Sequence, residues 1–332
     1  MYIFHRRKLL TVASAAAALV MAPGLRAQST VYPEKPVRLV VPYAAGGGTD
    51  QMARLLARKL TLIWGQSVIV ENKSGASEAI AALFVARAPA DGYTLLFNSD
   101  STFQMNPLLF TKLSYNPDKD LLPITRFSLG PVGLIVSSAM PVNTFKEFVS
   151  YARSKQKKLA YGSYGVANQT NLGLSWMSKQ LGLDMLHVPF AGQAPATLAL
   201  LSGDIDVILG NVVPSALAFI KEGKIKILAM SGERRLPNAP DIPTFRELGF
   251  NDLDTTITMG LAAPTGTPNA IIDKIVADVR KVAQDPEAIK IASDNLSMTL
   301  MTETPNEYRA FISRSRIELE QRIKAAGVGK LD

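Results

Sequence analysis

The chain has 332 residues, which is enough for two domains of roughly 100–200 residues each. It has no cysteine, which excludes disulfides, thiol catalysis and thiolate metal sites. The formal net charge is +8, but residues 1–27 hold four basic and no acidic side chains, so the remainder carries only +4. This is far from the dense positive charge of a nucleic-acid-binding protein, and no nucleic-acid partner is expected.

Residues 1–27 have the organisation of a secretory signal peptide. Arg6, Arg7 and Lys8 precede an apolar run too short to span a membrane, and a small residue, Ala27, ends the segment. The arginine pair fits twin-arginine export, and Sec export remains an equal alternative. We therefore expect a periplasmic mature chain that begins near Gln28. No later segment is apolar for long enough to insert it in the membrane.

Strand-like and helix-like segments alternate along the first part of the mature chain. Apolar, β-branched runs predict strands at residues 37–41, 68–71 and 94–98. Helical periodicity at residues 50–64 and 78–88 separates these strands. This alternation predicts a parallel, doubly wound sheet, so the fold class is α/β.

A second α/β unit follows, and three helices end the chain. It begins around residues 131–138, and its short strands are predicted at residues 159–161, 186–188, 207–209 and 225–230. Another strand-like run, at residues 257–263, precedes the three helices. Residues 144–147 match a capping box that opens a helix. The three C-terminal helices begin where Thr267, Asp285 and Thr304 each precede a proline.

Nothing resembling a repeat or a flexible linker separates the two units. We therefore expect the chain to cross between two lobes along strands. The predicted division places residues 28–132 and 256–332 in the first lobe and residues 133–255 in the second. The C-terminal helices are expected to pack back on the first lobe.

Three polar loops follow predicted strands. They have the sequences GGGTD at residues 46–50, NSDST at residues 98–102 and YGSYGVANQTN at residues 161–171. Glycine lets backbone N–H groups approach a ligand, and a helix start carries a partial positive charge. Because open α/β sheets bind ligands at the carboxyl ends of their strands, the loops are expected to face a common cleft. None contains Arg or Lys, so an anion would be held by neutral donors. Asp50 is either a helix cap or a ligand contact.

Other kinds of site fit the sequence poorly. The glycine loop lacks the lysine of a P-loop, and Gln51 stands where a dinucleotide fingerprint needs its third glycine. His187 is the one histidine of the mature chain, which argues against a metal site built from several imidazoles. Ser163 with His187 leaves a secreted serine hydrolase as an alternative, although Tyr161 stands where a nucleophile elbow needs glycine. We predict a protein that is not an enzyme and has no cofactor or metal.

Across the mature chain, the sequence resembles the extracytoplasmic substrate-binding receptors of the tripartite tricarboxylate transporter family, called Bug receptors. The resemblance rests on an ordered series of segments. They are PYAAGGGTD at residues 42–50, ENKSGA at 71–76, DGYTLL at 91–96, YGS at 161–163, HVPF at 187–190, APA at 194–196, LAM at 228–230, DIPT at 241–244 and PTGTP at 264–268.

The resemblance implies a two-lobed type II periplasmic-binding-protein-like fold with a ligand cleft between the lobes. Such receptors hold a carboxylate through backbone amides, small polar side chains and ordered waters. The ligand-binding residues implied here are Tyr43, Gly47, Gly48, Asp50, Ser99, Ser101, Thr102, Ser163, Gly165, Asn168, Thr170 and Asn211.

The chain departs from the family pattern at three places near this cleft. Ser77 and Glu78 stand where the family continues with glycines, which adds a carboxylate. Gly210 replaces a common aspartate, and Asn171 replaces a frequent histidine. These changes alter the charge where ligand selectivity is set.

We therefore expect a monomeric periplasmic receptor that captures a small carboxylate by lobe closure and delivers it to inner-membrane transporter subunits. The ligand classes considered are di- and tricarboxylates, amino acids and aromatic acids. A carboxylate sensor that is not coupled to transport remains an alternative on the same fold.

Overall fold

The computed structural model describes residues 32–332 apart from residues 156, 237–238, 251–252 and 254. The predicted signal peptide, residues 1–27, lies outside the described residues. Pro33–Asp332 forms one unit that contains two sheets. No helix among the described residues is long and apolar enough to cross a membrane.

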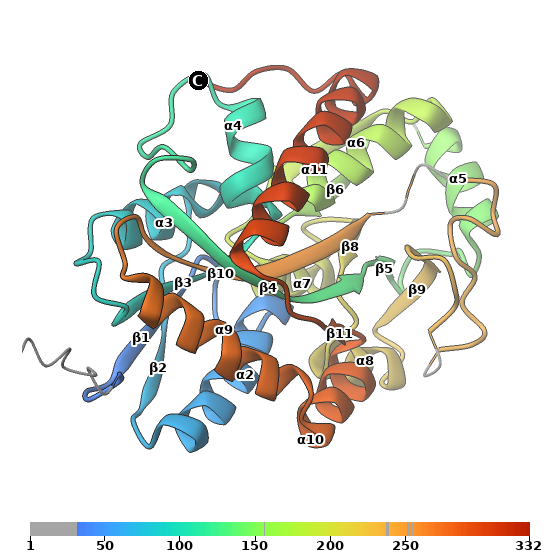
Figure 1. Ribbon diagram of the computed structural model, residues 1–332. Helices are drawn as coiled ribbons and strands as arrows, with labels where there is room; N and C mark the ends of the chain where they lie inside the picture. The colour runs from blue at the N-terminus through green and yellow to red at the C-terminus, as the bar shows by residue number, and fades with distance from the viewer. Residues whose placement is uncertain (1–31, 156, 237–238, 251–252, 254) are drawn as a thin grey trace, which may run out of the picture. The chain divides into compact units, whose positions relative to one another are not determined.

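The first sheet has six strands in the order β11-β4-β10-β3-β1-β2 (Figure 1). The strands are β1 (Val37–Val41), β2 (Val68–Asn72), β3 (Thr94–Ser99), β4 (Leu121–Pro131), β10 (Thr256–Pro264) and β11 (Thr299–Leu300). β1 runs parallel to both β2 and β3, whereas β10 is antiparallel to β3 and β4. The associated helical segments are α2 (Gly48–Trp64), η1 (Ala76–Glu78), α3 (Ala79–Ala86), η2 (Ser101–Met105), α4 (Asn106–Leu109), α9 (Asn269–Ala283), α10 (Pro286–Lys290), η3 (Ile291–Asn295) and α11 (Pro305–Ala326).

The second sheet has five strands in the order β7-β6-β8-β5-β9. The strands are β5 (Gly133–Ser137), β6 (Leu159–Ser163), β7 (Met185–Pro189), β8 (Val207–Gly210) and β9 (Ile225–Met230). β6 is parallel to β7 and β8, whereas β5 is antiparallel to β8 and β9. Its helices are α5 (Phe145–Ser154), α6 (Gln169–Leu181), α7 (Gln193–Ser202) and α8 (Pro214–Lys221).

The α/β fold class is confirmed, and the three strands predicted to be parallel, β1, β2 and β3, are parallel, but both sheets also contain antiparallel strands that were not predicted. Each sheet contains one strand that enters directly from the other sheet, β10 in the first and β5 in the second. A parallel neighbour requires a crossover connection, and neither of these strands has one before it. The long strand β4 was also not predicted. It buries the polar side chains of Thr125 and Ser128, which breaks the apolar pattern expected of a central strand.

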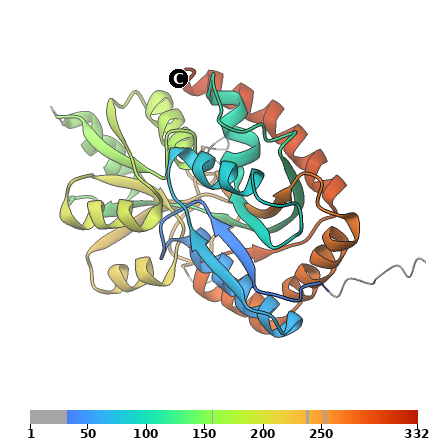
Figure 2. The same cartoon turned by 90° about the vertical axis from the view of Figure 1, so that its left-hand side faces the viewer.

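The chain passes between the sheets twice, at Val132 between β4 and β5 and again between β9 and β10. Figure 2 shows the yellow-green elements of the second sheet grouped apart from the blue and orange elements of the first. The predicted lobe boundaries at residues 132/133 and 255/256 correspond to these passages and stay a prediction. The C-terminal helix α11 packs on the first sheet, as predicted, through Tyr308 and Ile312, and it also contacts α6 through Leu319.

Two of the four predicted helix starts are confirmed in detail. Asp285 accepts a hydrogen bond from Ala288 N, and Thr304 forms a complete capping box with Glu307. Thr144 caps α5, but the Glu147 side chain accepts from Asn143 N, so the predicted capping box is incomplete. The predicted cap at Thr267 was wrong. Pro268 is the N-cap of α9, and the Thr267 hydroxyl donates to the carbonyl of Pro264 instead.

Candidate functional site

The ends of β1 and β3 and the start of α6 meet in a buried polar cluster. Tyr43 follows β1, and its hydroxyl lies 3.0 Å from Ser99 Oγ at the end of β3. Asn168, the N-cap of α6, donates from Nδ2 to Tyr43 Oη at 2.9 Å and to Ser101 Oγ at 3.3 Å. The structure therefore brings together predicted residues from two sheets. Their role in ligand binding stays a prediction.

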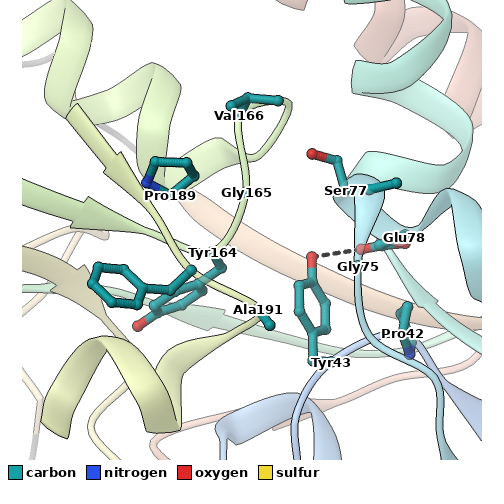
Figure 3. Close-up of a pocket in the computed structure, with 12 residues that line it drawn as sticks. Pro42, Tyr43, Gly75, Ser77, Glu78, Tyr164, Gly165, Val166, Pro189 and Ala191 are labelled. Atoms are coloured by element: carbon teal, nitrogen blue, oxygen red, sulfur yellow. Dashed lines mark hydrogen bonds between the residues drawn. The ribbon is translucent and has the colours of Figure 1, made fainter. Parts of the chain in front are cut away.

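Glu78 places its carboxylate within hydrogen-bonding distance of this cluster, and Figure 3 shows its hydrogen bond with Tyr43. Oε1 accepts from Tyr43 Oη at 2.6 Å and from Ser99 Oγ. Oε2 accepts from Thr102 Oγ1 and from the backbone N–H groups of Ser99 and Thr102, both at 3.2 Å. We call Tyr43, Ser99 and Thr102 the carboxylate cradle. Its five donors to Glu78 are all neutral.

In the part of the chain that the structure describes, no positively charged side chain donates to Glu78, so no opposite charge compensates for the burial of its carboxylate. The side chain is buried, and burial raises the pKa of Glu78 above its usual value although hydrogen bonds from Ser99, Thr102 and Tyr43 oppose the shift. Burial and the negative charge of Glu78 likewise raise the pKa of Tyr43. The hydroxyl of Tyr43 therefore stays protonated and remains a donor near neutral pH.

A cavity of about 280 Å³ lies against the cradle. Its walls come from the segment around Glu78, from the loop after β6 and from the end of β7 (Figure 3). The lining residues are Pro42, Tyr43, Gly75, Ala76, Ser77, Glu78, Tyr164, Gly165, Val166, Pro189, Phe190 and Ala191. Most of this lining was not predicted. The HVPF segment was a usable signal for Pro189 and Phe190, but only the fold shows that β7 ends beside the cradle.

The glycine loop makes close contact with the second sheet's elements. A Cβ on Gly48 would lie 2.9 Å from Asn211 Oδ1, and one on Gly47 would lie 3.3 Å from Gln193 Cβ. A Cβ at Gly48 would force Asn211 to shift, and one at Gly47 would push against Gln193, so glycine allows the two surfaces to approach closely. The structure brings Gly47, Gly48 and Asn211 together, and none of them is among the five donors that hold Glu78.

Asp50 is a brace for the glycine loop and not the N-cap of α2. The N-cap is Gly47, which makes no side-chain cap bond. Asp50 Oδ2 accepts from Gly46 N and from Arg54 Nε, both at 2.9 Å, and Oδ1 accepts from Asn72 Nδ2 at 2.9 Å. Burial opposes ionisation, but these hydrogen bonds outweigh it and lower the pKa of Asp50.

The third predicted loop is held by its own hydrogen bonds. Thr170 N and Oγ1 both donate to Asn168 Oδ1 at 2.9 Å, and Tyr164 N donates to Thr170 Oγ1. Gly165 has φ +127°, and a Cβ there would lie 2.9 Å from Ser77 Oγ. Thr170 therefore orients Asn168, while Gly165 allows the loop to approach the segment that carries Glu78.

Ser163 and His187 are adjacent. Ser163 Oγ lies 2.7 Å from His187 Nε2 and also donates to the carbonyl of Gly165 at 2.9 Å, so the single hydroxyl proton has two acceptors within reach. Ser163 is fully buried, and burial lowers the pKa of His187.

A second buried carboxylate, Asp100, lies beside the cradle and was not among the predicted site residues. It accepts from Thr258 N at 3.0 Å, from Thr258 Oγ1 and from Gln104 Nε2 at 3.2 Å. Burial, together with the charge of Glu78, raises the pKa of Asp100 to about 6. Among the described residues, no group of three or more His, Asp or Glu side chains is arranged to hold a metal ion.

Two mixed α/β sheets with a polar, carboxylate-holding site define the class of two-lobed periplasmic binding proteins. Residues 52–328 match the model of the tripartite tricarboxylate transporter family receptor, and the chain belongs to that family. Members of this family are periplasmic solute-binding proteins and not enzymes, so the hydrolase alternative is set aside.

Solved structures of similar proteins agree with this membership. The periplasmic binding protein BugD is 32% identical with a TM-score of 0.85, over 90% of this chain and 100% of that chain. Rpa4515 of R. palustris with adipate is 29% identical with a TM-score of 0.86, over 90% and 100%. MatC (Rpa3494) from Rhodopseudomonas palustris with bound malate is 31% identical with a TM-score of 0.81, over 88% and 100%.

Proposed function

We propose that this receptor captures a small carboxylate in the periplasm and delivers it, as a monomer, to the inner-membrane subunits of a tripartite tricarboxylate-type transporter. The observation that carries the proposal is the carboxylate cradle, which holds a carboxylate group through neutral donors alone. Such donors bind an anion strongly when they are fixed in a buried site of low dielectric. The adipate and malate bound by similar receptors belong to the same chemical class.

In this proposal the ligand contacts come from loops of both sheets. Tyr43, Ser99 and Thr102 form the carboxylate subsite on the side of the first sheet, where Glu78 is the acceptor of their hydrogen bonds, and Asn168 from the second sheet donates to Tyr43. Hinge closure of the two lobes around the ligand would bring these loops together. The remaining proposed contacts are Gly47, Gly48, Asp50, Ser101, Ser163, Gly165, Thr170 and Asn211.

The proposal is tested with mature protein that has been unfolded and refolded to remove any co-purified ligand. We expect a thermal shift with at least one member of a panel of di- and tricarboxylates, amino acids and aromatic acids, and calorimetry should give a one-to-one complex. If no member of the panel shifts the melting temperature, the proposal is contradicted. Uptake of the labelled ligand by cells that lack this protein separates transport from sensing, since unchanged uptake would contradict the transport role.

Closure is tested by Gly48→Ala, because the added Cβ would lie 2.9 Å from Asn211 Oδ1. Ligand affinity should fall by about tenfold, which corresponds to about 1.4 kcal/mol. The matched control is Gly329→Ala, where an added Cβ has nothing within 4 Å. Equal affinities for the two variants would show that ligand binding does not need this close approach.

A further inference from the structure

The carboxylate cradle is already full. Oε1 of Glu78 accepts two hydrogen bonds and Oε2 accepts three, so both oxygens have donors on all sides. A carboxylate has about four lone-pair positions in total. Glu78 therefore does not serve as an acceptor for donor groups of a solute, because donors of the protein already occupy both carboxylate oxygens.

The backbone that delivers Glu78 adopts an unusual conformation. Ala76, Ser77 and Glu78 have φ values of +45°, +47° and +75°, and they are three of the four described non-glycine residues with positive φ. L-residues avoid this region because Cβ approaches the carbonyl oxygen. These hydrogen bonds therefore hold a loop conformation that glycine would adopt more readily.

The space beside the cradle shows what remains for a solute. The cavity of about 280 Å³ has no Lys or Arg in its lining, and Pro42, Val166 and Phe190 contribute apolar walls. A solute carboxylate placed there would meet the buried charge of Glu78 and no compensating cation. Like charges in a buried site repel strongly.

We propose that Glu78 is an internal ligand whose side-chain carboxylate occupies the receptor's carboxylate subsite and excludes a solute carboxylate from it. This proposal rests on the proposed function, since it assigns the cradle to carboxylate binding. Glu78 thereby determines specificity. A dicarboxylate loses one of its two anchoring points, whereas a monocarboxylate with an apolar chain can place that chain in the cavity and its carboxylate elsewhere.

The experiment removes the Glu78 side chain by substitution and then adds a small molecule that has the same non-hydrogen atoms as the deleted side chain. Glu78→Gly deletes the equivalent of propionate and leaves a residue suited to φ +75°. We expect propionate to bind this variant at least tenfold more tightly than it binds the unaltered protein, measured by calorimetry, and to raise its melting temperature in a saturable way. Propionamide has the same shape without the charge and should do neither.

Two variants control for folding and strain. Ser77→Gly relaxes the neighbouring positive φ but leaves the cradle filled, so it should not gain propionate binding. Glu78→Gln keeps the side chain in place without its charge and should also gain none. If Ser77→Gly gains propionate binding to the same extent as Glu78→Gly, loop relaxation and not vacancy of the cradle is the cause, and the proposal fails.

The specificity claim is measured with adipate and hexanoate, which differ by one carboxylate. The ratio of their affinities, adipate over hexanoate, should rise by at least tenfold in Glu78→Gly relative to the unaltered protein. If the unaltered protein binds members of the carboxylate panel but Glu78→Gly shows neither gain, the internal-ligand proposal fails while the proposed function stands. If neither protein binds any carboxylate, both fail.

Discussion

Asp50 and Glu78 are buried carboxylates at the starts of two helices that follow strands of the same sheet, and they are held in opposite ways. Asp50 is bound by one cation, Arg54, together with Asn72 and a backbone N–H. Glu78 is bound only by hydroxyls and backbone N–H groups. The pKa of Asp50 is accordingly lowered, whereas the pKa of Glu78 is raised.

The two pKa shifts differ because different groups compensate Asp50 and Glu78 for the hydration that each carboxylate loses on burial. Arg54 supplies an opposite charge at 2.9 Å, one turn along the same helix α2, which offsets the desolvation of Asp50. Around Glu78 the compensation comes from dipoles that belong to three separate segments, those of Tyr43, Ser99 and Thr102. Those same dipoles would serve any carboxylate of the right size. We infer that the hydrogen bonds of Asp50 have a structural role, whereas the donors around Glu78 form a site in which another carboxylate could replace that of Glu78.

The largest effect is expected from breaking the brace. Asp50→Ala removes the acceptor of three hydrogen bonds, from Gly46 N, Arg54 Nε and Asn72 Nδ2, and it should lower the free energy of unfolding by about 3 kcal/mol. Urea denaturation measures this change. Arg54→Ala should cost only about 1 kcal/mol, because Arg54 is 52% exposed and two neutral donors still hold Asp50. Equal losses in the two variants would contradict the asymmetry.

The sequence was sufficient for the parts of the molecule that depend on local chemistry. Apolar periodicity located β1, β6 and β9, and the cap residues Asp285 and Thr304 located helix starts within a residue. These features are decided by neighbours along the chain. Strand direction is not, because β10 pairs with β3 and β4 across more than a hundred residues.

The candidate site shows the same division. Glycine and hydroxyl residues after strands marked the loops, and Glu78 was visible as an added carboxylate. The position of the Glu78 carboxylate in the cradle was not predictable, since it depends on three positive φ values and on donors from β3 and η2. Composition likewise suggested Asp50 as a cap, whereas the register of α2 places it one turn too late for that role.

The two kinds of carboxylate should respond to pH with opposite signs. Asp50 has a lowered pKa in the folded state, so its contribution is present above its unfolded pKa and is lost as the pH falls. Asp100 lies with Glu78 among neutral donors, and its pKa is raised from 3.8 to about 6. Its contribution is present below 3.8 and is lost as the pH rises through about 6.

We therefore expect the free energy of unfolding of the unaltered protein, minus that of Asp100→Asn, to fall by about 2 kcal/mol between pH 4 and pH 8. The corresponding difference for Asp50→Asn should rise over the acidic part of that range. Denaturant titrations at each pH measure both. The hydrogen bonds lost in each variant add an offset that does not depend on pH, so only the slopes of the two free-energy differences against pH test the prediction. Slopes of the same sign for Asp50 and Asp100 would contradict it.

The smallest effect separates the Glu78 carboxylate from the backbone that carries it. Glu78→Gly and Glu78→Ala both empty the cradle and differ only by a Cβ at φ +75°. The glycine variant should be more stable by about 1 kcal/mol, since L-residues are disfavoured in this conformation. The same pair of substitutions at Glu318, exposed in the middle of α11, should give the opposite order by about 1 kcal/mol, because glycine weakens a helix interior. If alanine is at least as stable as glycine at position 78, the loop is not strained, and the hydrogen bonds of Glu78 are not needed to hold it.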